Sequence, residues 1–332
     1  YEISACLVGS EMCIRDRDLT GGQEIEGAKM QILDQEGKVV EEWVSKKEAH
    51  VVYALAPGEY ILHEEQAPTE QGYVRAEDVK FVVEETGDVQ KVKMEDDHTK
   101  VSISKTDITD GKEIEGAKLQ ILDQDGEVVE SWTTGEEHLI EYLPVGTYTL
   151  HEEAAVDGYI VANDVEFTVE ETGEIQKVKM EDERAMGQLV IVKTDTDSKA
   201  ALEGVEFVLL EKETGKEVGR LKTGKDGKAV SELLPIGTYE NGVFKEPITY
   251  VLKETATLKG YEKTEEEWEI VFTYQNDKTP VIEVVKEIQN KKIPETPGTV
   301  KPGPKTGDDT NWFLPLLALG VSAGMVAGLL YY

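Results

Sequence analysis

Hydrophobic and polar residues alternate with a period of two along most of the chain, which is typical of β-strands with one buried face. The alternating runs are short, rich in Val, Ile, Tyr and Thr, and separated by Asp-Gly, Glu-Thr-Gly and Pro-x-Gly turns. No helical periodicity occurs before the uncharged apolar run from Trp312 to Tyr332. The pattern predicts an all-β protein of small antiparallel β-sandwiches. The run at 312–332 has the length of a transmembrane helix.

The same pattern recurs because the chain contains an internal repeat. The segment GGQEIEGAKMQILDQEGKVVEEW at residues 21–43 returns 89 residues later, at 110–132, as DGKEIEGAKLQILDQDGEVVESW. A third, looser copy begins at Gly187 and carries extra residues around Glu240 to Pro247. A unit of this length is too long for a solenoid repeat and suits a small domain.

The repeat defines the predicted domain organisation. We expect three β-sandwich domains at residues 18–97, 98–184 and 185–292, the first of them truncated. Residues 293–303 are Pro-rich and predict an extended spacer. Residues 304–332 carry the apolar run and the short motif before it.

The first 17 residues do not fit the repeat. YEISACLVGSEMCIRDR matches nothing later in the chain and resembles translated sequencing adaptor, so we interpret residues 1–17 as non-native. The chain's two cysteines, Cys6 and Cys13, both fall in this stretch. We therefore predict no disulfide, and exported domains would need another cross-link.

Charge and composition exclude several classes of function. With 35 Lys and Arg against 68 Asp and Glu, a net charge of -33, the chain has no basic patch for a phosphate backbone, and we predict no nucleic-acid binding. The five histidines lack metal-ligand spacing, and we predict no metal, no cofactor and no turnover enzyme: His50, His63, His98, His138 and His151.

Strand alternation places three polar residues of the second domain on the apolar face, in line with buried positions two and four residues earlier: Lys105, Glu152 and Asp182. The third domain repeats the arrangement with Lys193, Glu254 and Asn290. Each of these side chains would be costly in a core unless it met the others. The parity therefore predicts that each trio meets inside its domain.

These residues lie in motifs that resemble the collagen-adhesin B-type domains of Gram-positive adhesins and pilins, also called SpaA-type or prealbumin-like. The resemblance covers nearly everything from about Asp18 to Lys292. Its motifs are a KTD after the first strand, an EGA or EGV opening the next, Pro-x-Gly-x-Tyr turns and a Gly-Tyr pair: 105–107 and 193–195, 115–117 and 203–205, and 158–159 and 260–261.

The resemblance implies a self-formed isopeptide bond in each domain with a complete trio. Lys105 would attack Asp182 and expel water, assisted by Glu152. Lys193 would attack Asn290 and expel ammonia, assisted by Glu254. Burial disfavours charge, which supplies a neutral amine and a protonated acid. The alternative is a buried, hydrogen-bonded ion cluster without covalent chemistry.

The first domain lacks one member of the trio. Glu64 and Asp96 match Glu152 and Asp182, but Asp16 stands where the reactive Lys should be. We therefore predict no isopeptide bond in this domain, and Glu64 would be left without a Lys partner.

The motif before the apolar run consists of Pro304, Lys305, Thr306 and Gly307. It resembles the Leu-Pro-x-Thr-Gly sorting signal of Gram-positive surface proteins, with Gly303 in place of the usual Leu. The resemblance implies a sortase and a peptidoglycan precursor as partners and a cell surface protein joined to the wall through Thr306. The alternative is an ordinary membrane anchor.

Two further questions stay open from sequence. A pilin subunit is the competing interpretation, although the Tyr-Pro-Lys context of shaft pilins does not occur in this chain. A host or matrix ligand is also open, and the extra residues from Glu240 to Pro247 are where we expect adhesion if the chain binds one.

Overall fold

The computed structural model describes residues 10–86 and 88–295 of the chain. The predicted sorting signal and transmembrane helix at 304–332 lie outside these residues, as does most of the predicted spacer. The helical structure in the described ranges is one 3-10 turn at Thr69–Gln71. Within the same ranges, no helix is long and apolar enough to cross a membrane.

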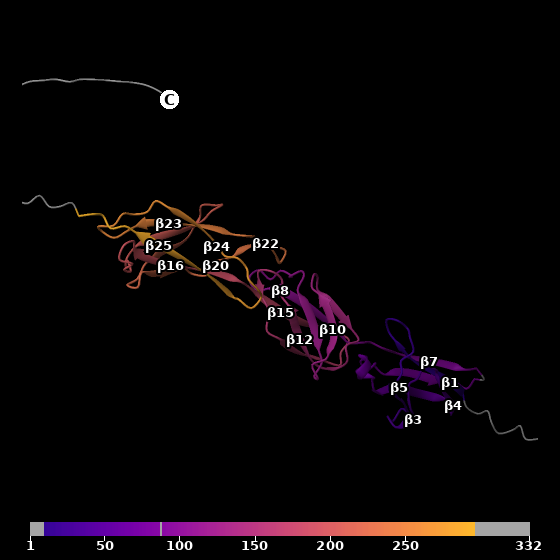
Figure 1. Cartoon of the computed structure of the whole chain (residues 1–332). Coiled ribbons are helices and arrows are strands. Elements are labelled where there is room, and N and C mark those ends of the chain that lie inside the picture. The colour runs from indigo at the N-terminus through magenta and orange to yellow at the C-terminus, as the bar shows by residue number, and fades with distance from the viewer. Residues whose placement is uncertain (1–9, 87, 296–332) are drawn as a thin grey trace, which may run out of the picture. The chain divides into compact units, whose positions relative to one another are not determined.

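The first domain, at the indigo end of the chain in Figure 1, consists of two sheets. The apolar side chains of both sheets share one core. One sheet has the order β3-β2-β5-β6 and the other β4-β1-β7. The strands are β1 (Ser10–Asp18), β2 (Lys29–Leu33), β3 (Val39–Val44), β4 (His50–Leu55), β5 (Gly58–Gln66), β6 (Val79–Val83) and β7 (Gln90–Asp96).

The second domain repeats this plan. Its sheets have the orders β10-β9-β12-β14 and β11-β8-β15-β13. The strands are β8 (Lys100–Asp107), β9 (Lys118–Leu122), β10 (Val128–Thr133), β11 (His138–Glu141), β12 (Gly146–Ala154), β13 (Tyr159–Ile160), β14 (Val165–Val169) and β15 (Ile175–Arg184).

The third domain keeps both sheets and adds a hairpin. The orders are β18-β17-β23-β24 and β19-β16-β20, with β25 pairing β16, and the hairpin is β21-β22. The strands are β16 (Met186–Asp195), β17 (Glu206–Glu211), β18 (Glu217–Lys222), β19 (Lys228–Val230), β20 (Leu234–Pro235), β21 (Gly237–Glu240), β22 (Val243–Pro247), β23 (Thr249–Ala256), β24 (Glu267–Val271) and β25 (Val281–Asn290).

The predicted all-β fold of tandem sandwiches is confirmed, and one pairing in each domain is parallel. The first and last strands lie side by side in the same direction: β1 with β7, β8 with β15, and β16 with β25. The other strand pairs are antiparallel. Alternation along one strand cannot reveal this, because it carries no information about the direction of the neighbour.

Residues 10–17 form most of β1, although we interpreted 1–17 as non-native. Met12 and Ile14 are 1% and 2% exposed and belong to the core of the first domain. Because apolar residues alternate with polar ones in this segment, it can form the first strand with its apolar side chains in the core. The origin of residues 1–17 stays a prediction.

The β21-β22 hairpin holds the extra residues of the third copy and contacts the second domain. Tyr239 donates a hydrogen bond from its hydroxyl to the carbonyl oxygen of Gly158 at 2.8 Å. Gly158 has φ +90°, and a Cβ built there would lie 2.7 Å from Phe244. The hairpin therefore fits against a backbone position that requires glycine.

This packing generates a prediction with a matched control. Gly158→Ala should destabilise the chain more than Gly260→Ala. Both positions have a positive φ, +90° and +88°, but a Cβ at Gly260 meets no atom within 4 Å. Each change costs about 1 kcal/mol of backbone strain, and Gly158→Ala adds about 1–3 kcal/mol of overpacking. Urea unfolding of both variants measures the difference, and equal losses would contradict the packing role.

Candidate functional site

The three predicted residues of the second domain meet between its two sheets. Lys105 lies on β8, Asp182 on the neighbouring β15, and Glu152 on β12 of the opposite sheet. The Lys105 Nζ atom donates a hydrogen bond to Asp182 Oδ1 and lies 2.9 Å from Glu152 Oε2. The side chains of Lys105 and Glu152 are 1% and 0% exposed. The structure thus brings the predicted trio together in a dry interior.

The register of the parallel strands explains why Lys105 and Asp182 meet. Lys105 is opposite Met180, and Asp182 is opposite Asp107, so the two reactive residues are offset by two positions. Two positions is one full side-chain period in a strand, so both point to the same face. The long lysine side chain spans the offset.

Burial changes the protonation of Asp182. Removal from water raises the pKa of this carboxyl to about 7, with Glu152 adding to the rise and Lys105 opposing it. A fraction of Asp182 is therefore neutral near pH 7, whereas an exposed aspartate is fully ionised. A neutral carboxyl is a better electrophile than a carboxylate because its carbonyl carbon carries more positive charge.

The trio of the third domain forms a closed ring of hydrogen bonds. Lys193 Nζ donates to Glu254 Oε2 at 2.9 Å and to Asn290 Oδ1 at 2.5 Å. Asn290 Nδ2 in turn donates to Glu254 Oε1 at 2.7 Å. One glutamate thus contacts the amine with one oxygen and the amide nitrogen with the other. Burial lowers the pKa of Lys193, while Glu254 opposes the shift.

Sequence reasoning missed Thr257, which completes this ring. Its Oγ1 accepts the second N–H of Asn290 Nδ2 at 2.7 Å. Thr257 comes just after the end of β23, where alternation gives no guidance. The second domain has Ala155 at the matching distance after its glutamate. This difference fits the chemistry, because an amide brings two N–H donors and a carboxyl at most one.

The first domain holds three acids where the other two hold a lysine. Asp16 on β1 is opposite Met94, as Lys105 is opposite Met180, so it occupies the lysine position. One oxygen from each of Asp16, Glu64 and Asp96 lies within 4.8 Å of the others. The exposed fractions of these residues are 6%, 0% and 0%. Among the described residues, no lysine or arginine takes the place of the missing amine in this trio.

Three buried acids cannot all ionise together. Burial raises the pKa of Asp16 to about 6, of Glu64 to about 7 and of Asp96 to about 10. Repulsion from Asp16 and Glu64 adds to the rise at Asp96. The folded first domain therefore holds protons that the unfolded chain would release.

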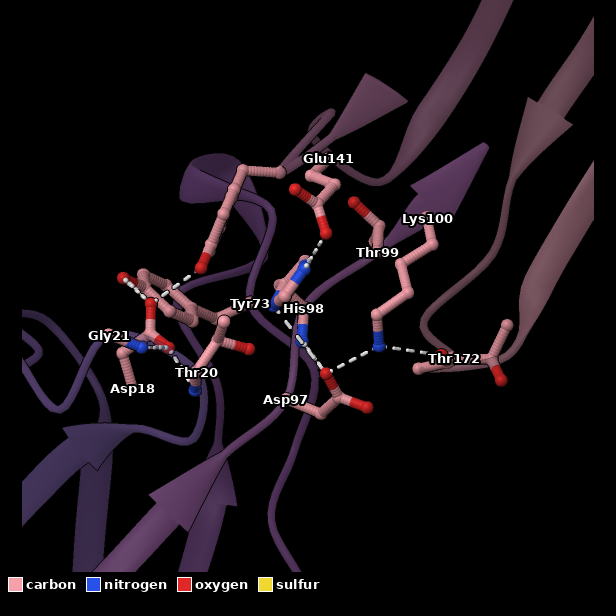
Figure 2. A network of polar contacts seen from close by, with 12 residues as sticks. Asp18, Thr20, Gly21, Tyr73, Asp97, His98, Thr99, Lys100, Glu141 and Thr172 are labelled. Atoms are coloured by element: carbon pink, nitrogen blue, oxygen red, sulfur yellow. Dashed lines mark hydrogen bonds and ion pairs between the residues drawn. The ribbon is translucent and has the colours of Figure 1, made fainter. Parts of the chain in front are cut away.

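Sequence reasoning also missed the role of the aspartate that ends each KTD-type motif. Figure 2 shows the environment of Asp18, whose Oδ1 accepts the backbone N–H groups of Thr20 and Gly21 at 2.6 and 2.9 Å. Its Oδ2 accepts the hydroxyls of Tyr142 at 2.7 Å and Tyr73 at 3.3 Å. Burial would raise the pKa of Asp18, but these hydrogen bonds outweigh it and lower the pKa.

The equivalent aspartate of the second domain has a similar role. Asp107 Oδ2 accepts the hydroxyl of Tyr159 at 2.8 Å and the Nε–H of Arg184 at 2.6 Å. Tyr73 and Tyr159 both follow a glycine with positive φ. In both of these domains, the tyrosine of the Gly-Tyr pair thus donates a hydrogen bond to the aspartate that ends the KTD-type motif. The two motifs recur together in the repeats, and this joint recurrence is the sequence signal that could have revealed the contact.

Where Arg184 contacts Asp107, the preceding repeat has His98. Figure 2 shows the His98 ring bonded to Glu141, with an Nε2 to Oε1 distance of 3.1 Å. His98 also stacks on Tyr142 at 3.9 Å between ring centroids. Asp97 accepts from the His98 backbone N–H and from Lys100 Nζ. The Tyr142 side chain that stacks on His98 also donates to Asp18, so this network joins the first domain to the second.

The extra residues of the third copy do not form a free loop. Our expectation of an adhesive site there rested on their length alone, and the structure uses their aromatic side chains for packing. Tyr239 lies under the Arg184 guanidinium, 4.2 Å from it, and Phe244 lies against Gly158. The hairpin therefore packs within the chain through these aromatic side chains, and adhesion at residues 240–247 stays a prediction.

The chain matches a known domain family along most of its length. The model of the SpaA family, described as a prealbumin-like fold domain, matches residues 10–98, 99–184 and 187–247. These matches span more than half of the chain, so the chain belongs to this family. It contains three tandem SpaA-type domains.

Solved structures that match this chain include the TIE protein and two proteins named as pilins. The Bacillus anthracis TIE protein is 28% identical with a TM-score of 0.54, and the match covers 85% of this chain and 50% of that one. The major pilin subunit BcpA of Bacillus cereus is 15% identical with a TM-score of 0.47, covering 85% and 99%. A streptococcal ancillary pilin is 16% identical with a TM-score of 0.34, covering 86% and 99%.

The chain spans about half the length of the TIE protein. No curated protein matches the chain significantly.

The acids of the first domain predict an unusual dependence of stability on pH. Their folded pKa values of about 6, about 7 and about 10 lie above the unfolded values. The stabilising protonation is therefore complete below about pH 4 and is lost as the pH rises through the folded values. We expect the first domain to be less stable at pH 8 than at pH 5.

Calorimetry of the full chain at both pH values tests this. Asp16→Asn should raise the stability of the first domain at pH 8 by about 1–3 kcal/mol, and the transition that it shifts identifies that domain. The exposed substitution Glu36→Gln is the control. An Asp16→Asn transition that depends on pH as strongly as the original would contradict this assignment.

Proposed function

We propose that this chain is a structural cell-surface protein, a stalk or adhesin anchored by a sortase, whose domains are stabilised by autocatalytic isopeptide bonds. The observation that carries the proposal is the meeting of Lys, Glu and Asp or Asn in the second and third domains, at contact distance and with all six residues buried. Membership in the SpaA family supports it. The anchoring part rests on Pro304 to Gly307 and on the apolar run after them.

In the second domain, the reaction joins Lys105 Nζ to Asp182 Cγ. The ammonium first gives up a proton, for which Glu152 Oε2 at 2.9 Å is in position. The neutral amine then attacks the carbonyl carbon of protonated Asp182. The bond from Cγ to the hydroxyl oxygen breaks as Glu152 delivers the proton to that oxygen, and water leaves. The nitrogen gives its second proton to Glu152, which ends the reaction protonated.

In the third domain, Lys193 Nζ forms a bond to Asn290 Cγ and the bond from Cγ to Nδ2 breaks. Glu254 accepts a proton from the amine through Oε2 and delivers it to the leaving nitrogen through Oε1, since each oxygen already contacts its partner. Ammonia leaves. Each bond forms once per molecule, so this chemistry is maturation and turns over no substrate.

The bonds would serve to carry tension. The chain enters each domain through the first strand and leaves it through the last, and these strands are the parallel pair. Force on the ends of a parallel pair shears it, and an amide between the strands takes the load before their hydrogen bonds do. The proposed result is a surface stalk that resists unfolding and proteolysis.

The intact mass of the purified chain tests the cross-links. We expect the chain to be lighter than its sequence mass by one water and one ammonia. Lys105→Ala should restore only the water and Lys193→Ala only the ammonia. Glu152→Gln and Glu254→Gln keep each lysine but remove the proton carrier. Glu152→Gln should therefore also restore the water, and Glu254→Gln the ammonia. A full sequence mass would leave the trios as buried polar clusters.

The first domain offers a gain-of-function test. Asp16→Lys supplies the missing member of the trio opposite Met94, in the register of Lys105. We expect this variant to lose one additional water through a bond to Asp96. The double variant Asp16→Lys with Glu64→Gln is the control and should lose none. An Asp16→Lys chain that folds but keeps its mass would show that the register alone does not promote the reaction.

A further inference from the structure

The first domain contains a set of buried carboxyl oxygens to which the described chain supplies few donors. With the three acids ionised, both oxygens of Asp16, both oxygens of Asp96 and Oε1 of Glu64 accept no hydrogen bond, and the protons that the acids hold pair Asp96 with Asp16 and Glu64. Glu64 Oε2 alone accepts a backbone N–H, from Ala76 at 2.7 Å. Buried polar atoms are nearly always paired in folded proteins. The orphaned oxygens converge, since one from each residue lies within 4.8 Å of the others.

The sister domains show which ligand such oxygens accept. At the equivalent glutamates, a primary ammonium lies 2.9 Å from Oε2 of Glu152 and of Glu254. That ammonium is the end of a lysine that starts from the position of Asp16. The Asp16 side chain is two atoms shorter along its length and carries the opposite charge. The first domain therefore keeps the acceptors of an ammonium site without its cation.

A cavity reaches this position from the surface. It has a volume of about 360 Å³, and Asp16 is one of its walls. The other walls are both apolar and polar: Ile14, Met30, Trp43, Val44, Ala49, Ser45, Lys46, Glu48 and His50. A carboxylate in the wall of a cavity that also has apolar walls suits a ligand with a short alkyl group and a charged amine.

We propose that the first domain binds a small primary alkylammonium ion between Asp16, Glu64 and Asp96, at the place that lysine Nζ occupies in the other domains. An ammonium has three N–H donors, which match one acceptor oxygen from each residue. A divalent metal fits less well, because Ca²⁺ takes six to eight oxygens and Mg²⁺ keeps several waters. The site is a property of the chain with Asp16, and with Lys at that position it would be filled from within.

The proposal does not depend on the cross-links of the other domains. Binding is measured from the NMR signals of the ligand, whereas the cross-links are measured from the intact mass of the protein. The probe is ethylammonium chloride, titrated into the full chain and followed by ligand-observed NMR. Tetramethylammonium has no N–H donors and is the control ligand.

We expect saturable binding of ethylammonium and none of tetramethylammonium. Asp96→Asn and Glu64→Gln preserve the shape of the site and should each weaken binding at least about tenfold, as the loss of a charge-assisted hydrogen bond in a buried site requires. Asp16→Lys should abolish binding because the nitrogen of its own side chain fills the site, whether it stays an ammonium or forms the amide bond to Asp96. Glu36→Gln, on the exposed surface of the first domain, should leave binding unchanged.

Three results would overturn the proposal. The first is a lack of saturable binding by a chain whose thermal unfolding shows that the first domain is folded. The second is binding that persists in Asp16→Lys. The third is tight binding of Ca²⁺ or Mg²⁺ that the same substitutions abolish and that ethylammonium does not displace, which would make this a metal site.

Discussion

The structure depends on how a charged amine is held between two β-sheets. An isolated ammonium in a protein interior is strongly unfavourable, and it is tolerated only where acceptors surround it. Glu152 and Asp182 surround Lys105, and Glu254 and Asn290 do the same for Lys193. The requirement couples the two sheets, because the glutamate comes from one and the other two residues come from the opposite one. The first domain keeps the same fold with three acids, so the fold does not require the amine. The unfavourable burial of these acids appears as raised pKa values.

The order of the strands in the sheet determines how the buried trio relates to mechanical tension along the chain. The amine and its target lie on the first and last strands, which are neighbours in the sheet and run parallel. The last strand of the second domain ends at Arg184 and the first strand of the third begins at Met186, so one buried residue, Ala185, separates them. Tension that leaves one domain therefore enters the next almost directly. In the proposed function, covalent bonds lie on this path.

Sequence predicted much of the site because alternation fixes which face a side chain occupies. Lys105 and Lys193 were assigned to the core from parity alone, and both are buried at 2% and 0% exposure. Parity could not reveal the parallel pairing, because strand direction depends on the whole topology. It could not place Thr257 either, since this residue lies just past the end of β23, where strand alternation has stopped. The hairpin that contacts Gly158 required tertiary structure, because its partner lies 81 residues earlier in the chain.

The most direct test of the central claim is peptide mapping of the protease-digested chain by tandem mass spectrometry. The account predicts branched peptides in which the segment containing Lys105 is joined to that containing Asp182, and the segment containing Lys193 to that containing Asn290. The same digest should contain only a linear peptide around Asp96. Linear peptides with unmodified Lys105 and Lys193 would contradict the account, and the trios would then be buried polar clusters that hold the sheets together without covalent bonds.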